Sequence, residues 1–269
     1  EARGVRVERY LIVEPSPQLR ERQYETLAAL GHIDIQWLGA PPAHFRGAVL
    51  ANEVLDAMPV KLFLRVASGV LERGVSLNEE GSFEWRDAPA TAAVDDAVRA
   101  LEAQLGALPT PYLSEWPLAA QAWAASLANW LEQGAALLID YGFPRHEFYH
   151  PQRSTGTLMC HYRHRAHTDP LWLPGLNDIT AHVDFSAVAE QACAQGLEVL
   201  GYTAQSHFLI NCGLLSMLPA GGAAPQATQA AQRLISETEM GELFKVLALG
   251  RGLSEPLLGF QRGDRSHTL

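Results

Sequence analysis

The chain has 269 residues, of which 48% are hydrophobic, and its formal net charge is −10 at pH 7. This length can bury the core of one large α/β domain or of two small ones, whereas the acidic balance argues against nucleic acid as the main partner, because phosphate binding needs a basic face. No apolar run reaches the roughly 18 residues of a membrane span, and three cysteines without paired spacing indicate a reducing compartment, so we expect a cytoplasmic protein without a membrane span.

The first predicted unit is a buried strand followed by a helix, within residues 9–31. Ser16 can cap a helix whose first residue is Pro17, and Gly31 can end it. Glu14 follows the strand, at the position where an open α/β sheet often places the acid that binds a nucleotide ribose. A solvated acid near a helix N-terminus, favoured by the helix dipole, is the alternative interpretation.

The next part of the chain alternates strands with helices, which is typical of a mostly parallel sheet. Strands are predicted at 32–37, at 47–52 and from 134 to Asp140, and helices at 91–106 and 117–133. Residues 61–86 instead contain three strand-like runs separated by Ser-Gly and Glu-Gly turns. That pattern predicts an antiparallel meander inserted into the order of the sheet.

The C-terminal part opens with a long Pro-, Gly- and His-containing segment at 143–180. A long segment without regular secondary structure in a compact domain more often has a function than none. Beyond it, the pattern predicts helices at 184–195, 205–217 and 239–249, strands at 197–203 and 256–263, and a small-residue loop at 220–229.

The string "ANEVLDAMP" places three polar side chains after the strand at 47–52, namely Asn52, Glu53 and Asp56. This is the sheet edge at which doubly wound folds bind ligands. Glu53 and Asp56 are three residues apart, so on a helix they would share a face and could hold a cationic acceptor. The alternative is a capping arrangement, in which Asn52 caps the helix and the acids favour its first turn.

Five of the ten histidines fall within residues 146–167. The string "CHYRHRAH" invites a zinc interpretation, but it lacks the separated ligand pairs of structural zinc sites, and its arginines would repel a cation. We therefore expect no metal. The segment 143–169 carries four arginines against two acidic residues, so it could contact an acidic surface, although a solvated run of charges is the commoner explanation.

The string "PGLNDITAHVDF" contains three further candidates, Asp178, His182 and Asp184. Asp184 is a natural N-cap for the helix that follows. Asp178 and His182 have no equally simple structural role, so we expect both on the substrate side of the site. Asp140 and His164 are further candidates for substrate binding.

Taken together, these motifs resemble the MidA-type S-adenosylmethionine-dependent methyltransferases, a family that includes a mitochondrial complex I assembly factor with protein arginine methyltransferase activity. The resemblance rests on six collinear segments between residue 11 and about residue 250: "LIVEPSPQLRERQ", "ANEVLDAMPV", "LLIDYGFP", "GTLMCHYRHR", "PGLNDITAHVDF" and "MGELFKVLALG".

The resemblance implies an α/β fold with a Rossmann-like class I methyltransferase sheet, mostly parallel with an antiparallel final strand. It implies S-adenosyl-L-methionine as the cofactor, with Glu14 at its ribose, Trp37 near its adenine and Asn52 on the cofactor side. Glu53 and Asp56 would lie at the methyl-transfer edge, with Asp178 as a further catalytic acid.

The family places a glycine-rich cofactor loop after a strand that precedes "LIVEPS", and no such strand precedes it here. We therefore expect a longer intact protein, of which residues 1–269 are one methyltransferase domain lacking its first strand. Two insertions are expected in it, a meander with a helix at 61–116 and a substrate-side segment at 143–180.

The resemblance implies methylation of a protein arginine, with a respiratory complex I subunit as the partner. Two other classes of function stay open. One is a non-catalytic assembly factor that docks through the basic segment 143–169, and the other is a metal-dependent hydrolase built on the histidine cluster. Binding of S-adenosylmethionine separates the enzyme from the assembly factor, and metal analysis tests the hydrolase.

Overall fold

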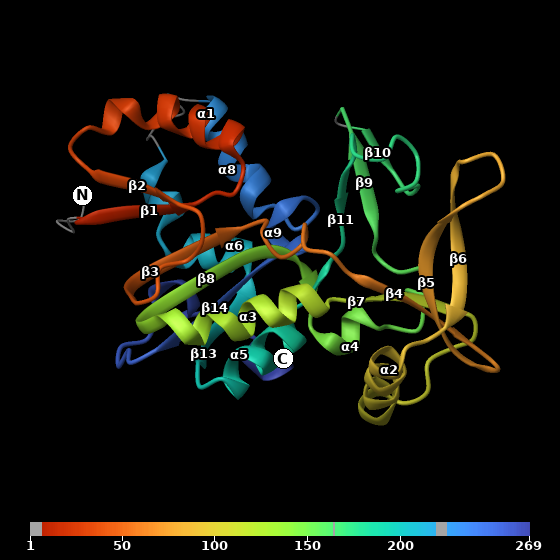
Figure 1. Ribbon diagram of the computed structural model, residues 1–269. Helices are drawn as coiled ribbons and strands as arrows, with labels where there is room; N and C mark the ends of the chain where they lie inside the picture. Colours follow the sequence, from red (N-terminus) through yellow and green to blue (C-terminus); the bar gives the residue numbers. More distant parts are fainter. Residues whose placement is uncertain (1–6, 164, 219–224) are drawn as a thin grey trace. The chain divides into compact units, whose positions relative to one another are not determined.

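The computed structural model describes residues 7–163, 165–218 and 225–269 (Figure 1). The chain divides into two compact units, Glu1–Arg46 and Gly47–Leu269. Each unit has its own β-structure, and the prediction of a single domain over 1–269 stays a prediction. Among the described residues, no helix combines the length and the hydropathy that a membrane-spanning segment requires.

The first unit is a strand–helix–strand motif. Strand β1 (Arg9–Val13) pairs in parallel with β2 (Asp34–Leu38), and helix α1 (Pro17–Leu27) connects them with the short 3₁₀ helix η1 (Ala28–Leu30). The predicted start of the helix is confirmed, because the Ser16 hydroxyl accepts a hydrogen bond from the backbone N–H of Leu19 at 3.3 Å. The last turn tightens before Gly31, so the α-helix itself ends earlier than predicted.

The second unit is built on a five-stranded sheet of order β12-β8-β14-β13, with β3 pairing on β8. Its strands are β3 (Phe45–Asn52), β8 (Leu131–Phe143), β12 (Val183–Asp184), β13 (Glu198–Ala204) and β14 (Phe244–Arg251). Strand β12 runs parallel to β8, whereas β14 runs antiparallel to both of its neighbours. The predicted α/β class with an antiparallel final strand is therefore confirmed.

Both faces of this sheet are covered at β14, because its alternate side chains point to opposite faces and seven consecutive residues are buried. Val246 and Ala248 of β14 pack with Phe260 and with Phe208 of α6 (Gln205–Asn211). On the other face, Phe185 of α5 (Phe185–Ala194) contacts the Tyr202 ring at 5.4 Å, and α5 packs on α3 (Leu118–Trp130) (Figure 1). The predicted cap Asp184 is confirmed, since it accepts from the N–H of Ala187 at 3.0 Å.

A second sheet follows β3 in the sequence and has the order β6-β5-β4-β7. Its strands are β4 (Lys61–Val66), β5 (Gly69–Leu77), β6 (Phe83–Pro89) and β7 (Tyr112–Trp116), and all its pairings are antiparallel. The predicted meander is confirmed, and β7 is a fourth strand that the sequence pattern does not reveal. Helix α2 (Ala92–Leu105) buries Val94 and Val98 in a core with Phe63 and Tyr112.

The long segment after β8 is more ordered than the sequence pattern indicates. It contains the short helix α4 (Arg145–Phe148) and a three-stranded antiparallel sheet of order β10-β9-β11. The strands are β9 (Met159–Tyr162), β10 (Arg165–His167) and β11 (Asp178–Thr180). These four short elements therefore replace the expected irregular segment and bring Met159, Thr180 and His182 beside the end of β8.

The predicted helix at 239–249 and the predicted final strand at 256–263 are both wrong. Only Met240–Leu243 are helical, as α9, and the apolar run "FKVLALGR" is the final strand β14. A short apolar run can form either a helix or a strand buried on both faces, and here seven consecutive residues of β14 are buried. Residues 258–260 form the 3₁₀ helix η3 (Leu258–Phe260) instead of a strand.

Other boundaries also differ from the predictions. The helix predicted at 205–217 divides at Gly213, whose φ is 87°, into α6 and α7 (Leu214–Met217). The predicted loop at 220–229 lies partly outside the described residues, and its second half begins helix α8 (Pro225–Ile235). Strand β8 continues beyond Asp140 to Phe143, and η4 (Ser266–Thr268) is the last element.

Gly142 is expected to be essential for the junction of β8 with β12. A Cβ atom at this position would lie 2.6 Å from the backbone nitrogen of Val183 and closer still to its carbonyl oxygen. Because backbone atoms cannot swing away, we expect Gly142→Ala to lower the free energy of unfolding by about 3 kcal/mol, as overpacked cores do. Denaturant unfolding measures this loss.

Gly74 of β5 supplies the control for that substitution. Its nearest neighbour would be the Arg86 carbonyl oxygen at 3.9 Å, an ordinary contact, so Gly74→Ala should change the free energy of unfolding by less than about 0.5 kcal/mol. Equal stability of the two variants would contradict the close approach of β12 to β8.

Candidate active site

A cavity of about 690 Å³ opens at the carboxyl end of β8 in the second unit. Five segments line it: the loop after β3, the ends of β8 and of β11, strand β9, and the junction of α9 with β14. The lining residues are Glu53, Asp56, Tyr141, Met159, His161, Arg163, Asp178, Thr180, His182, Leu243 and Phe244. All three acids singled out as catalytic from the sequence therefore line one cavity, and so does His182.

The loop after β3 is not a helix, so the prediction that Glu53 and Asp56 share a helix face is wrong. Residues 53–58 form bends and turns, and Glu53 has a φ of 50°, in the left-handed region. A non-glycine residue in that conformation costs on the order of 1–3 kcal/mol and is frequent at functional sites. Asn52 has no helix to cap, and its exposed amide donates to Glu53 at 3.2 Å.

Asp140 stabilises the non-helical conformation of this loop by binding its backbone N–H groups. Its buried Oδ2 accepts hydrogen bonds from the backbone N–H groups of Leu55 at 3.0 Å and Asp56 at 3.2 Å, and Oδ1 accepts from the N–H of Tyr141 at 2.9 Å. Burial, and then the charge of Asp56, raise the pKa of Asp140 to about 7. The side chain expected to bind substrate thus lies beneath the loop and positions Asp56.

Asp56 presents one bare carboxylate oxygen within the cavity wall. Its Oδ2 accepts a hydrogen bond from the Tyr141 hydroxyl, whereas its Oδ1 is buried and has no partner among the described residues. Burial raises the pKa of Asp56, and the neighbouring charge of Asp178 raises it further. A buried, unpartnered acceptor is costly in a folded protein, so this oxygen is the strongest sign of a ligand-binding role in the cavity.

Tyr141 and His182 fix the surroundings of that oxygen. The Tyr141 ring packs edge-on against the rings of His182 at 5.4 Å and of Phe244 at 5.3 Å. The Nδ1 atom of His182 is buried without a partner among the described residues. Burial, aided by the charges of Arg153 and Lys245, lowers the pKa of His182 to about 4, so this imidazole is neutral at pH 7.

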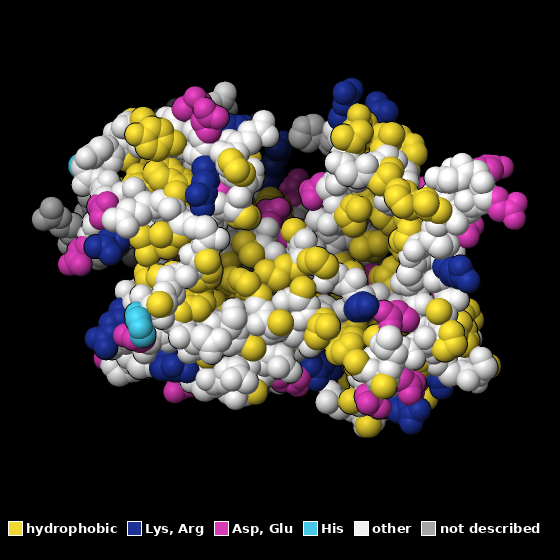
Figure 2. Space-filling view, in the orientation of Figure 1, with side chains coloured by type: hydrophobic (Ala, Val, Ile, Leu, Met, Phe, Trp, Pro, Cys, Tyr) yellow, Lys and Arg dark blue, Asp and Glu magenta, His cyan; other side chains and the backbone are white. Residues whose placement is uncertain are grey.

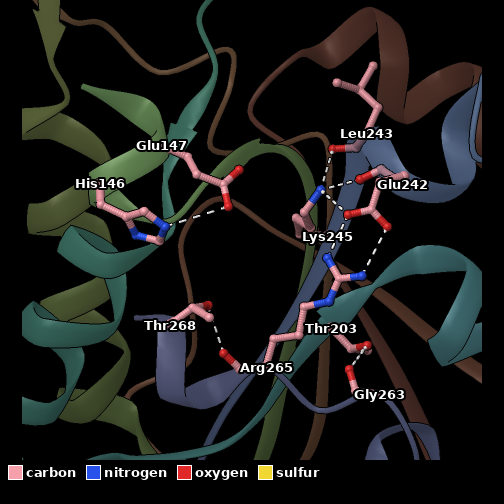
Figure 3. A network of polar contacts seen from close by, with 9 residues as sticks. All are labelled: His146, Glu147, Thr203, Glu242, Leu243, Lys245, Gly263, Arg265 and Thr268. Atoms are coloured by element: carbon pink, nitrogen blue, oxygen red, sulfur yellow. Dashed lines mark hydrogen bonds and ion pairs between the residues drawn. The ribbon is translucent and has the colours of Figure 1, made fainter. Parts of the chain in front are cut away.

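Lys245 is a buried cation that follows Leu243 and Phe244 in the sequence and binds the backbone of this part of the cavity wall (Figure 3). The Lys245 ammonium donates to the carbonyl oxygens of Glu242 and Leu243 and lies 3.6 Å from the Glu242 carboxylate. Arg265 binds the same carboxylate through two hydrogen bonds, at 2.6 and 3.3 Å. Sequence reasoning missed Lys245, although it is one of only two lysines in the chain.

The residues predicted at the cofactor ribose and adenine lie in the first unit. Glu14 follows β1, and its two carboxylate oxygens accept hydrogen bonds from the N–H of Ser16 at 2.9 Å and from the Gln23 amide at 3.1 Å. The Gln23 amide oxygen accepts from the Trp37 indole at 3.0 Å, and the Trp37 ring contacts Tyr24 at 5.5 Å. Gln23, which the sequence analysis did not single out, therefore links Glu14 to Trp37.

Two further predictions concern His164 and metal binding. His164 lies outside the described residues. Within 7–163, 165–218 and 225–269, no group of three or more His, Cys, Asp or Glu side chains is placed to hold a metal ion. The histidines of the segment 146–167 thus form no such group in the part of the chain that the structure describes.

Comparison with known proteins identifies similar sequences and structures. The family model described as "Putative S-adenosyl-L-methionine-dependent methyltransferase" matches residues 4–203. A Burkholderia thailandensis protein whose crystal structure contains S-adenosyl-homocysteine is 48% identical, with a TM-score of 0.92, over 100% of this chain and 70% of that one. A native crystal structure from the same organism is 49% identical, also with a TM-score of 0.92, over 100% of this chain and 73% of that one.

Curated relatives are more distant. "Protein arginine methyltransferase NDUFAF7, mitochondrial" from Danio rerio is 29% identical over 206 residues, which are 74% of this chain and 46% of that protein. The protein of the same name from Mus musculus is 30% identical over 209 residues, which are 74% of this chain and 45% of that protein. The chain thus spans less than half the length of the curated relatives that it matches.

Proposed function

The chain belongs to this family of S-adenosyl-L-methionine-dependent methyltransferases, and from that premise we propose that it transfers a methyl group from S-adenosyl-L-methionine to a guanidinium nitrogen of an arginine in a protein. The single observation that carries the choice of acceptor is the bare Oδ1 of Asp56 in a cavity that Glu53 and Asp178 also line. The names of the curated relatives support the same acceptor.

A guanidinium group suits this cavity because it is a planar cation with five N–H donors and no acceptor. Asp56 supplies a carboxylate for one of those donors: the Tyr141 hydroxyl holds its Oδ2, and its buried Oδ1 has no partner among the described residues. Glu53 and Asp178 add negative charge at more exposed positions. Neutral His182 adds an apolar and hydrogen-bonding wall without repelling the cation.

The chain's contribution to the reaction is to orient the acceptor and to receive a proton. Methylation of a guanidinium releases one proton overall, because both the substrate and the product carry a single positive charge. The raised pKa of Asp56 makes this carboxylate a better proton acceptor than an ordinary aspartate. Asp56 therefore aligns the nitrogen through a charge-assisted hydrogen bond and takes up the proton.

The residues of the first unit fit the cofactor. Each oxygen of the Glu14 carboxylate accepts one hydrogen bond from the protein, and an ionised carboxylate has about four acceptor sites. Glu14 can therefore hold the two ribose hydroxyls, and Trp37 can line the adenine. When bound, S-adenosyl-L-methionine supplies the electrophilic methyl group.

Replacing Glu14 with Ala is expected to weaken binding of S-adenosyl-L-methionine by about 10- to 100-fold, because the ribose hydroxyls lose a charged acceptor. Isothermal titration calorimetry on the intact protein measures the change. Glu21→Ala, which removes an exposed acid from the same helix, is the matched control and should bind normally. Normal affinity in the Glu14 variant would mean that this carboxylate does not bind the cofactor and only stabilises the start of α1.

The acceptor is tested with synthetic peptides and radiolabelled S-adenosyl-L-methionine. Peptides with a single arginine should accept label, whereas matched peptides with lysine or citrulline at that position should not. Transfer to lysine would contradict the arginine acceptor. Cofactor binding without transfer to any peptide or to a protein extract would favour the non-catalytic assembly factor.

The protein target and the compartment are further parts of the proposal. The resemblance set out above favours a respiratory complex I subunit as the substrate, and the three cysteines without paired spacing favour the cytoplasm as the site of action. Mass spectrometry of the complex from cells that lack this protein tests the target. The proposal expects one arginine of the complex to lose its methylation, and an unchanged complex would contradict it.

A further inference from the structure

A second cavity, of about 510 Å³, adjoins the acid-lined cavity. The two share Met159 and His182 as lining residues, so they are neighbouring spaces. The rest of the wall comes from strands β4, β5, β6 and β7, from residues between 153 and 159, and from Thr168 and Pro170. We call this second space the Arg153 cavity, after the cation that distinguishes it.

Arg153 is held in place without being neutralised. Its guanidinium lies over the Phe143 ring, 4.2 Å from the ring centroid, and its Nε donates a long hydrogen bond of 3.4 Å to the Glu147 carbonyl oxygen. No carboxylate of the described ranges 7–163, 165–218 and 225–269 lies within ion-pair distance of it. The terminal nitrogens are thus fixed and open to a ligand.

The other charged residues of this cavity are already matched. Arg73 binds Asp87 through two hydrogen bonds, at 2.7 and 2.9 Å. Glu115 is buried, and its Oε1 accepts from the N–H groups of Thr157 at 2.7 Å and Leu158 at 2.9 Å. Burial raises the pKa of Glu115, whereas the backbone hydrogen bonds to its carboxylate lower it. Arg153 is therefore the cation of this cavity that has no carboxylate partner within the described ranges 7–163, 165–218 and 225–269.

Apolar side chains form much of the remaining wall, including Trp85, Leu113 and Pro170. Figure 2 shows hydrophobic side chains gathered over the region of β5, β9 and β10 on the face in view. Val75, Leu77 and Phe83 of the β5–β6 hairpin are among the exposed large hydrophobic residues of the chain. Such walls suit the backbone and side chains of a polypeptide.

We propose that the Arg153 cavity binds an aspartate or glutamate side chain of the substrate polypeptide, close in sequence to the arginine that enters the acid-lined cavity. The proposal rests on the proposed function and adds a sequence preference to it. Three carboxylates line the first cavity, and the guanidinium of Arg153 lines the second, so together they can recognise a cation and an anion on one chain.

The spacing follows from the adjacency of the cavities. The two cavities share Met159 and His182 as lining residues, and an extended chain advances about 3.3 Å per residue. The acidic residue is therefore expected within about four residues of the arginine.

The test measures binding of fluorescent peptides to the intact protein by anisotropy, with S-adenosyl-homocysteine present so that no turnover occurs. The peptides carry one arginine among Ala, Ser and Gly, have blocked termini, and place a single Glu or Gln at each position up to four residues away. At one position on one side, Glu should bind about tenfold more tightly than Gln. In Arg153→Gln the ratio should fall to about 1.

Three controls make the result specific. Arg99→Gln removes an exposed charge of α2 outside the cavity and should keep the tenfold ratio. Arg153→Lys retains a charge without the planar stacking group and should give an intermediate ratio. Melting temperatures confirm that each variant is folded.

Two outcomes would overturn the inference: equal binding of Glu and Gln peptides at every position, or a Glu preference that survives in Arg153→Gln. A gain from an unblocked C-terminus without any gain from Glu would also overturn it, since the occupant would be a terminal carboxylate. Peptides with lysine in place of arginine separate this inference from the proposed function. Binding that is insensitive to that change contradicts the arginine acceptor, while the ratio of Glu to Gln binding is still measured.

Discussion

Replacing Asp56 with Asn is expected to lower kcat for methyl transfer by about 100-fold or more, while the affinity for S-adenosyl-L-methionine changes by less than about twofold. The amide keeps the shape of the side chain, but it removes the charge that orients the guanidinium and accepts the proton. Removal of one preorganised electrostatic contact typically costs about 10²- to 10³-fold in kcat. Single-turnover kinetics with an arginine peptide measure the effect.

Glu53 supplies the comparison within the same loop. Its side chain is exposed, so water screens its charge, and Glu53→Gln should lower turnover by only about tenfold. A fall in kcat with little change in cofactor binding indicates an interaction made in the transition state. If Asp56→Asn kept normal turnover per folded molecule, Asp56 would be a structural acid, and the acceptor site would have to lie elsewhere.

The sequence predicted those helices and strands correctly whose local residue pattern is compatible with a single type of secondary structure. The capped helix α1, the parallel strand β2 and the antiparallel meander all follow from alternation, capping and turn residues. Strand β14 could not be distinguished from a helix in this way, because its seven consecutive buried residues are apolar or glycine apart from Lys245, and one polar residue marks no period. Its place between β8 and β13 is decided by tertiary pairing.

The candidate site was only partly predictable, for a related reason. Position at the end of a strand pointed to Glu53 and Asp56, and the composition of one segment pointed to Asp178 and His182. The sequence alone could not show that Asp140 would take the backbone N–H groups of the loop. That capture depends on a contact across 84 and 85 residues of chain, so no local signal records it.

Tyr141 and Arg153 were missed because their roles depend on partners far away in the sequence. Tyr141 belongs to an apolar strand and looks like a core residue, yet its hydroxyl binds Asp56. Arg153 belongs to a run of charges that could be solvated, yet its guanidinium stacks on Phe143 of β8. In both cases the role of the side chain depends on a residue that is distant in the sequence, Asp56 for Tyr141 and Phe143 for Arg153.

Replacing Asp140 with Ala is expected to lower the free energy of unfolding by about 3 kcal/mol and to reduce methyl transfer strongly. Two backbone N–H groups of the loop would lose their acceptor in a buried site, and each unsatisfied group costs about 1–3 kcal/mol. Asp140→Asn retains one acceptor oxygen and should lose less stability. Denaturant unfolding of both variants, beside the wild type, measures the difference.

The pH dependence of the free energy of unfolding tests whether Asp140 is protonated in the folded protein. The pKa of this carboxyl is 3.8 as an ordinary aspartate and about 7 in the folded protein, so between pH 4 and 7 the folded state holds a proton that the unfolded chain has released. The free energy of unfolding should therefore fall as pH rises through this range, by up to about 1.4 kcal/mol per pH unit. Asp140→Asn removes that titrating group, and its stability should fall less steeply from pH 4 to 7. Parallel slopes in the two proteins would mean that Asp140 is ionised in the folded state and that the loop is held by a charged carboxylate.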